Sequence, residues 1–488
     1  MTRARLLGLV AATVCAAGWP LANALAAEEL PPIVDAAKAD RRETAARLIE
    51  RGENVNVAEA DGTTALHWAA RAADAQLVKL LLAAGAAANA ANRYGVTALQ
   101  LAAENGDSAT VRALLAADAN PNAALPEGET VLMTAARTGA PEALRLLLDA
   151  GADSHAREHW YGETALIWAT AEDHAAAVKL LLAHGADVNE RSALQHFDKR
   201  RAGQSILSLG EWTPLMYAAR EDARASAATL IAAHAGLDLV DPDGATALVI
   251  AILNANYELA KQLLDAGADP NIVDNDAGMG ALYAAVDMHR LAIGHGRPNP
   301  RPSGTFGAED VVRALLARGA DPNARLKKPI MQRQHTFGDG SLGEGAAPLM
   351  RAAKSGDVAL MKQLVDAGAD PKLEMPNGST ALMYAVGLGW RNGSALAPSY
   401  DQGSEDDAIE AVKLLRSLGL DLRAANHDGD TPLHAAIAGR HSEKIVHFLL
   451  DEGANPRAAN AKGQTPLTLA EARGPPDVLA MLREAAGR

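Results

Sequence analysis

The sequence predicts an all-α solenoid of about twelve stacked helix–turn–helix units with hairpin fingers. Three observations support this prediction. A seven-residue motif recurs eleven times, an amphipathic helical pattern follows most copies, and aromatic residues make up only 3% of the chain. Because 49% of the 488 residues are hydrophobic and few are aromatic, the core is expected to consist of close-packed helices rich in Ala, Leu and Val.

The recurring motif opens each unit and fixes the period. It reads TALHWAA from Thr64, TALQLAA from Thr97 and TPLHAAI from Thr431, with related copies between them. Most successive copies of its leucine are 33 or 34 residues apart. A period of this length indicates a repeat architecture, in which one unit cannot bury its apolar face alone and stacked neighbours share a continuous core.

A second, longer helix is expected after each motif. In segments such as AVKLLLAHGADVN, apolar residues fall at i, i+3 and i+4, which is the spacing of a helix with one buried face. Gly151, Gly185, Gly267 and Gly319 follow such segments, at the place where a helix commonly ends in a left-handed residue. An extended finger then leads to the next motif.

These motifs resemble the ankyrin-repeat family. A 33-residue period and a T-P-L-H-x-A motif are the signature of that family, and the strict form survives in the TPLH that begins at Thr431. The resemblance spans residues 31–488, with an atypical unit from Ile33 as the N-terminal cap. It implies a protein-binding scaffold, and the family pattern names no catalytic residue. We therefore expect no enzymatic activity, no cofactor and no metal.

Residues 1–26 have the pattern of a secretory signal peptide. Two arginines precede an apolar run over residues 6–17, and A-L-A at 24–26 forms a small-residue cleavage site. A retained N-terminal anchor is the alternative. We expect residues 27–488 to form a single solenoid that is periplasmic or secreted, with no membrane insertion after signal removal.

The charge and the cysteine content favour a protein partner. A formal net charge of −14 argues against nucleic acid, because non-specific nucleic-acid binding needs basic surface. The only cysteine, Cys15, lies inside the signal pattern, so the processed chain would have neither a disulfide nor a thiol nucleophile.

One short match points to a different chemistry. His155, Glu158 and His159 spell H-x-x-E-H, which in one class of zinc peptidases places two imidazoles and a carboxylate on one helix face. Here the match lies between the glycine that ends one unit and the threonine that opens the next, so we expect a finger without zinc. This finger is one residue longer than most. It presents His159, Trp160 and Tyr161 together, and these are candidates for partner binding.

Other matches have simpler interpretations. GDGSLG from Gly338 follows no predicted strand, so a glycine-rich loop is favoured over a dinucleotide site. His434 is the motif histidine, which in this family is a hydrogen-bonding framework residue. The next motif position is often large and apolar, as in Trp68, Trp168 and Tyr217, and we favour core packing there over binding.

Three intervals between motif leucines exceed the period. They predict inserted loops near 190–210, 289–308, 324–345 and 387–407. Two inserts are expected to extend fingers and two to extend the turn between paired helices. Repeat proteins often place such insertions on the binding face. The first three inserts are net basic and hold three of the four phenylalanines, whereas the fourth is net acidic.

Basic, aromatic loops on an acidic body are typical of a selective surface for an acidic partner. The alternative is that each phenylalanine anchors its loop while Arg and Lys are solvated. The inserts add these candidates for partner binding: Phe197, Arg200, Arg201, Arg297, Phe306, Lys327, Lys328, Arg333 and Phe337. We expect the contacts on the concave face and the inserted loops, from about residue 155 to 407. The alternative function is a small-molecule or anion binder, with or without enzymatic activity, in the loops of residues 289–345.

Overall fold

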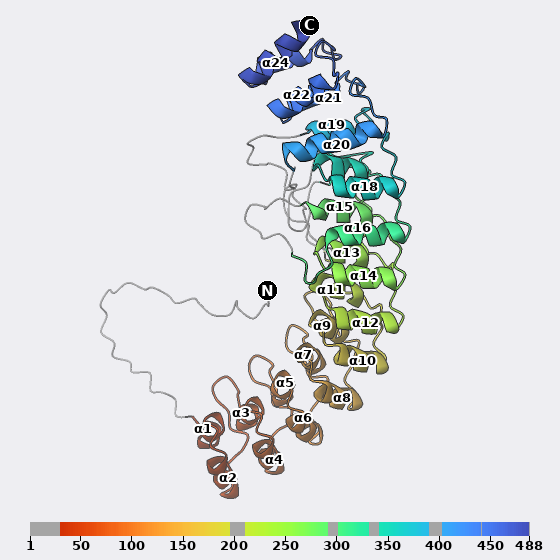
Figure 1. The fold of residues 1–488 in the computed structure, drawn as a ribbon. Coiled ribbons are helices and arrows are strands. Elements are labelled where there is room, and N and C mark those ends of the chain that lie inside the picture. Colours follow the sequence, from red (N-terminus) through yellow and green to blue (C-terminus); the bar gives the residue numbers. More distant parts are fainter. Residues whose placement is uncertain are drawn as a thin grey trace, which may run out of the picture.

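The protein forms a curved stack of paired helices, as a computed structural model shows (Figure 1). The structure describes residues 30–195, 210–290, 301–330, 341–389, 403–440 and 442–487. Within these ranges it has 24 helices and no strand, which confirms the predicted all-α solenoid of twelve units. None of these helices is both long and apolar enough to cross a membrane.

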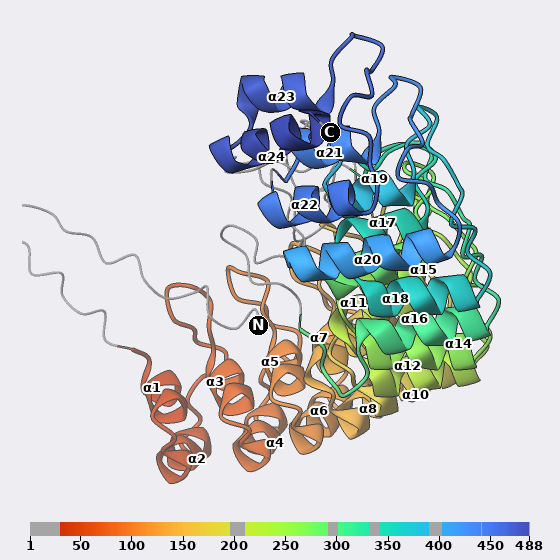
Figure 2. The same cartoon turned by 45° about the horizontal axis from the view of Figure 1, so that its top comes forward.

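Each unit pairs two helices, which we call the inner and the outer helix in chain order. From α1 to α14 the inner helices lie on the concave side of the arc (Figure 1). The inner helices are α1 (Pro32–Lys38), α3 (Ala65–Arg71), α5 (Ala98–Glu104), α7 (Val131–Thr138), α9 (Ala165–Ala171), α11 (Pro214–Glu221), α13 (Ala247–Leu253), α15 (Ala281–His289), α17 (Pro348–Lys354), α19 (Ala381–Val386), α21 (Pro432–Ala438) and α23 (Pro466–Arg473). The outer helices are α2 (Arg42–Glu50), α4 (Ala75–Ala83), α6 (Ser108–Leu115), α8 (Pro141–Asp149), α10 (Ala175–Ala183), α12 (Arg224–Ala232), α14 (Tyr257–Asp265), α16 (Ala308–Ala317), α18 (Val358–Asp366), α20 (Glu405–Ser417), α22 (Glu443–Asp451) and α24 (Pro476–Gly487). Figure 2 shows α12, α14, α16, α18 and α20 side by side in one layer.

The first residues of the motif explain where the inner helices begin. Thr97 and Thr130 accept hydrogen bonds from backbone N–H groups three residues later, which satisfies donors that a helix start leaves open. The ring of His434 contacts the Thr431 hydroxyl at 2.9 Å and the Gln464 carbonyl of the next finger at 3.1 Å. The expected framework role of His434 is therefore confirmed.

Neighbouring units are joined by the core and by two regular hydrogen bonds. The motif leucines are buried, as Leu66 and Leu132 illustrate at 1% exposure each. Between finger tips, the His159 N–H donates to the Glu127 carbonyl at 2.8 Å. Near the helix ends, the Asn122 amide donates to the Gly151 carbonyl of the next unit at 3.1 Å. Gly151 has φ +86°, as its place after the outer helix predicts.

The predicted inserts are located in the chain by the helices on either side of them. They fall between α10 and α11, α15 and α16, α16 and α17, and α19 and α20. The first and third therefore extend fingers, and the second and fourth extend turns between paired helices. Six predicted binding residues lie outside the described residues: Phe197, Arg200, Arg201, Arg297, Arg333 and Phe337.

The inner side of the C-terminal half carries a buried ion pair. Arg351 on α17 donates to Asp287 on α15 at 2.6 Å, and both side chains have no exposed surface. Next to it, His289 contacts Asp357 at 2.5 Å. This hydrogen bond raises the pKa of His289 and helps to hold the pKa of Asp357 low, although burial opposes both shifts. Ser341 contacts Lys354 and accepts from the Tyr384 hydroxyl through its carbonyl, so the end of the third insert lies against α17 and α19.

Removal of Arg351 is expected to destabilise the stack. Arg351→Met would leave the Asp287 carboxylate buried without its main partner, which typically costs about 3–5 kcal/mol. Urea unfolding measures the effect as a lower midpoint. The double variant Asp287→Leu/Arg351→Met serves as the control, because removal of both charges should recover part of the loss. An unchanged midpoint for Arg351→Met would contradict the assigned ion pair.

Candidate partner-binding surface

The aromatic finger, defined as residues 155–163, is shaped by one buried carboxylate. The Glu158 side chain is 6% exposed and accepts hydrogen bonds from three backbone N–H groups of its own loop. The donors are Trp160 at 2.6 Å, Tyr161 at 2.8 Å and Glu163 at 2.9 Å. Three charge-assisted hydrogen bonds on one carboxylate hold the loop backbone in a single turn.

The contacts of Glu158 span more of the loop than those of the equivalent residue in an ordinary finger. In an ordinary finger, Asn92 accepts from the N–H groups of Tyr94 and Val96, two and four residues later. Glu158 serves N–H groups two, three and five residues later. The finger that ends at Gly278 is equally long, and there Asp274 accepts from N–H groups two to five residues later, so the wider span follows the length of the loop.

Neighbouring fingers clamp the aromatic finger on both sides. The His159 N–H donates to the Glu127 carbonyl of the preceding finger. The Tyr161 carbonyl accepts from the Ala193 N–H of the following finger at 2.6 Å. Arg157 donates to the Gly162 carbonyl and pairs with Glu190, each at 2.8 Å. The side chains nevertheless point outward, since Trp160 is 70% and Tyr161 is 48% exposed. His159 is exposed as well.

The H-x-x-E-H match lies in this finger and not on a helix, as expected. Its carboxylate is engaged by the loop backbone, and His155 lies 3.7 Å from Glu190. In the described ranges, no group of three His, Cys, Asp or Glu side chains is placed to hold a metal ion.

A line of side chains runs along the inner helices, one from each unit. We call Trp68, Leu101, Thr134 and Trp168 the inner row. The two tryptophans are half-buried against the core, and a cation covers each ring. The Arg71 guanidinium lies 5.6 Å from the Trp68 ring centre, and that of Arg137 lies 5.3 Å from Trp168. Further along, Tyr217 is 5% exposed, so packing dominates at this motif position as expected.

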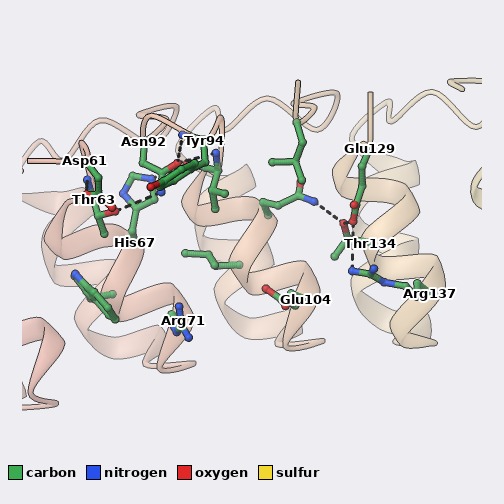
Figure 3. Close-up of a pocket in the computed structure, with 15 residues that line it drawn as sticks. Asp61, Thr63, His67, Arg71, Asn92, Tyr94, Glu104, Glu129, Thr134 and Arg137 are labelled. Carbon is green, nitrogen blue, oxygen red and sulfur yellow. Dashed lines mark hydrogen bonds and ion pairs between the residues drawn. The ribbon is translucent and has the colours of Figure 1, made fainter. Parts of the chain in front are cut away.

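A pocket opens where the inner row is small. Next to Trp68, the side chains of Leu101 and Thr134 line a hollow of about 450 Å³ below the fingers. Figure 3 shows its lining from α3, α5 and α7. Along the floor, Gln100 donates to Thr134 at 2.5 Å and Thr134 donates to Glu129 at 2.8 Å. We call this hollow the groove pocket.

The groove pocket combines neutral and charged groups. Burial lowers the pKa of His67, whose ring is held by the Thr64 hydroxyl and the Val96 carbonyl, so this imidazole is neutral near pH 7. The Thr63 N–H lowers the pKa of Asp61, which is therefore a carboxylate. Arg137 pairs with Glu129 at 3.3 Å. Outside the pocket, burial raises the pKa of Glu163 at the base of the aromatic finger.

The described insert residues divide into two groups. Phe306 is partly buried against the core, which matches the alternative that phenylalanine anchors its loop. Lys327 and Lys328 are exposed, and Lys328 pairs with Asp276 on the neighbouring finger. The structure thus gathers His159, Trp160 and Tyr161 on one finger and places the two lysines on another, between α16 and α17.

Sequence reasoning missed the groove pocket and the role of Glu158. The pocket depends on two neighbouring units that both have small inner-row residues, which no single motif reveals. Tyr94, which is 62% exposed above the pocket, could have been found by aligning the fingers. It precedes the finger glycine, as Tyr161 does.

Comparison with known proteins is consistent with the repeat geometry. A family model described as ankyrin repeats matches residues 33–124, 114–192, 194–293 and 402–487. A putative ankyrin repeat-containing protein of Treponema pallidum (strain Nichols) is 32% identical over 147 residues, which is 30% of this chain and 38% of that protein.

Two eukaryotic relatives match shorter fractions of their own length. The mitochondrial disaggregase of Bos taurus is 38% identical over 171 residues, 35% of this chain and 20% of that protein. The ankyrin repeat and SAM domain-containing protein 6 of Danio rerio is 33% identical over 132 residues, 26% of this chain and 17% of that protein. The chain therefore spans less than two fifths of each of these three relatives.

Substitution of Glu158 is expected to loosen the aromatic finger. Glu158→Ala removes the acceptor of three N–H groups, so the amides of Trp160, Tyr161 and Glu163 should exchange with solvent at least ~10-fold faster. Hydrogen exchange read by NMR measures this. Asn92→Ala is the matched control, because it should speed exchange in its own finger only. Unchanged exchange at residues 160–163 in Glu158→Ala would show that the carboxylate does not order the loop.

Proposed function

Because the chain belongs to the ankyrin-repeat family, whose model matches more than half of it, we propose that it is a non-catalytic scaffold that binds another protein. Ankyrin repeats generally mediate protein–protein interaction, and ankyrin-repeat proteins are typically non-catalytic scaffolds. In our proposal the partner contacts the concave side and the fingers, with the aromatic finger as the energetic centre. We propose further contacts from the inserted loops.

The observation that carries the proposal is the exposure of two aromatic side chains on a rigid loop. Trp160 and Tyr161 are largely exposed although hydrogen bonds to Glu158 and to neighbouring fingers fix their backbone. Binding costs less when the backbone of the contacting loop is already ordered. Tryptophan and tyrosine are also the residues that most often dominate interface energies, because they combine a large apolar area with a polar tip.

We further propose that the protein acts outside the cytoplasm, as a periplasmic or secreted scaffold. The support is the signal-peptide pattern in residues 1–26 and the absence of cysteine after it. The measured mass of the chain isolated from its own cells tests this. A chain that starts at Ala27 is expected, and a chain that still includes residues 1–26 would contradict it.

The described residues do not favour the alternative of an anion site in the loops of residues 289–345. The Lys328 ammonium pairs with Asp276 rather than facing an open cradle. Phe306 packs against the core, as a loop anchor would.

Loss of the exposed indole is expected to weaken partner binding. Trp160→Ala should raise the dissociation constant of the captured partner at least ~10-fold, which is about 1.4 kcal/mol, because an ordered anchor is lost. The partner is captured on the immobilised full chain, identified by mass spectrometry, purified and titrated by calorimetry. Leu80→Ala is the matched control, since Leu80 is 42% exposed but lies on the outer helix α4. Equal affinity of Trp160→Ala and the unmodified chain would refute the role of the aromatic finger.

A further inference from the structure

The mouth of the groove pocket holds two charged side chains without a matching ion pair. Arg71 on α3 and Glu104 on α5 are exposed and line the same pocket. Arg71 lies against the Trp68 ring, and neither side chain forms an ion pair with another described residue. Figure 3 shows Glu104 between Arg71 and Arg137 along the helices, with Tyr94 nearer the fingers.

The lining of the pocket is net acidic. Three carboxylates line it, those of Asp61, Glu104 and Glu129, against the two guanidinium groups of Arg71 and Arg137, and Arg137 is paired with Glu129. Arg71 keeps its charge beside the Trp68 ring, so the excess is one negative charge. The pocket therefore presents Glu104 and the ionised Asp61 to an incoming group. The chain as a whole carries a net charge of −14, so its field also favours a cation.

The exposed ring of Tyr94 favours arginine over lysine as the bound cation. An arginine side chain is planar, forms two parallel hydrogen bonds with a carboxylate and stacks on an aromatic face, whereas lysine offers a point charge. A hollow of about 450 Å³ with an aromatic wall and a free carboxylate at its mouth fits a bulky basic side chain.

We infer that the groove pocket binds an extended, basic segment of the partner protein through an arginine that pairs with Glu104 and stacks on Tyr94. This inference rests on the proposed protein-binding function and specifies the partner's chemistry at one place. The basic segment would contact the N-terminal half of the concave side. The acidic partner predicted from the sequence would instead contact the basic inserts.

The repeat sets the length of the bound segment. Helix layers lie roughly 10 Å apart, and an extended chain rises about 3.3 Å per residue, so each unit matches about three residues. The fingers that hold Tyr94 and Trp160 are two units apart. One segment of roughly six residues therefore reaches from the pocket to the aromatic finger.

A positional-scanning library of acetylated, amidated nine-residue peptides tests this inference on the full immobilised chain. Pools with a fixed arginine should bind at least ~10-fold more strongly than pools with a fixed aspartate. Glu104→Gln should remove most of this preference, and Glu104→Arg should reverse it. Trp160→Ala should lower binding of all pools without changing the charge preference.

The controls separate this inference from the proposed function. Glu443→Arg makes the same charge change on the outer helix α22 and should leave the preference intact. Circular dichroism checks that each variant stays helical. Equal binding of arginine and aspartate pools, or a preference that Glu104→Arg does not change, would overturn the inference. Failure of every pool would also overturn it, while the proposed function would still be judged by the effect of Trp160→Ala on the captured partner.

Discussion

The stacked architecture depends on one constraint, which is that a single helix pair cannot bury its own apolar face. Stacking removes that face from water only if each unit presents leucine at the same place and ends its outer helix at the same place. Hydrogen bonds between units enforce the same spacing, as when the Asn122 amide bonds to the Gly151 carbonyl. The stack therefore tolerates long inserts at its joints but not changes to the repeated contacts.

The same constraint decides where the concave side is open. The inner row varies in residue type and burial from unit to unit: Thr134 is buried, whereas Trp68, Leu101 and Trp168 are only partly buried against the core. In the N-terminal half, Trp68, Leu101 and Thr134 line a pocket. In the C-terminal half, Arg351 occupies the corresponding motif position and is fully buried with Asp287. We infer that recognition concentrates in the half where the inner row stays accessible.

The sequence predicted the features that repeat and missed those that do not. The period and the glycine stops predicted the helix pairs, and the position of the H-x-x-E-H match predicted a finger. The exposure of Trp160 and Tyr161 agrees with their choice as candidates, although partner binding by them stays a prediction. The pocket could not be predicted, because it arises from the difference between adjacent units. The burial of Arg351 was not predicted either. An arginine is usually exposed to solvent, and only the structure shows that Asp287 lies opposite this one.

The central claim is that the groove pocket, which Leu101 and Thr134 line beside Trp68, is the recognition site. Leu101→Trp tests it most directly, because the larger ring would fill part of the hollow that Leu101 lines. Calorimetric titration of the purified partner is expected to show at least ~10-fold weaker binding, with a thermal unfolding midpoint close to that of the unmodified chain. Unchanged affinity in a variant whose crystal structure shows the pocket filled would contradict the account.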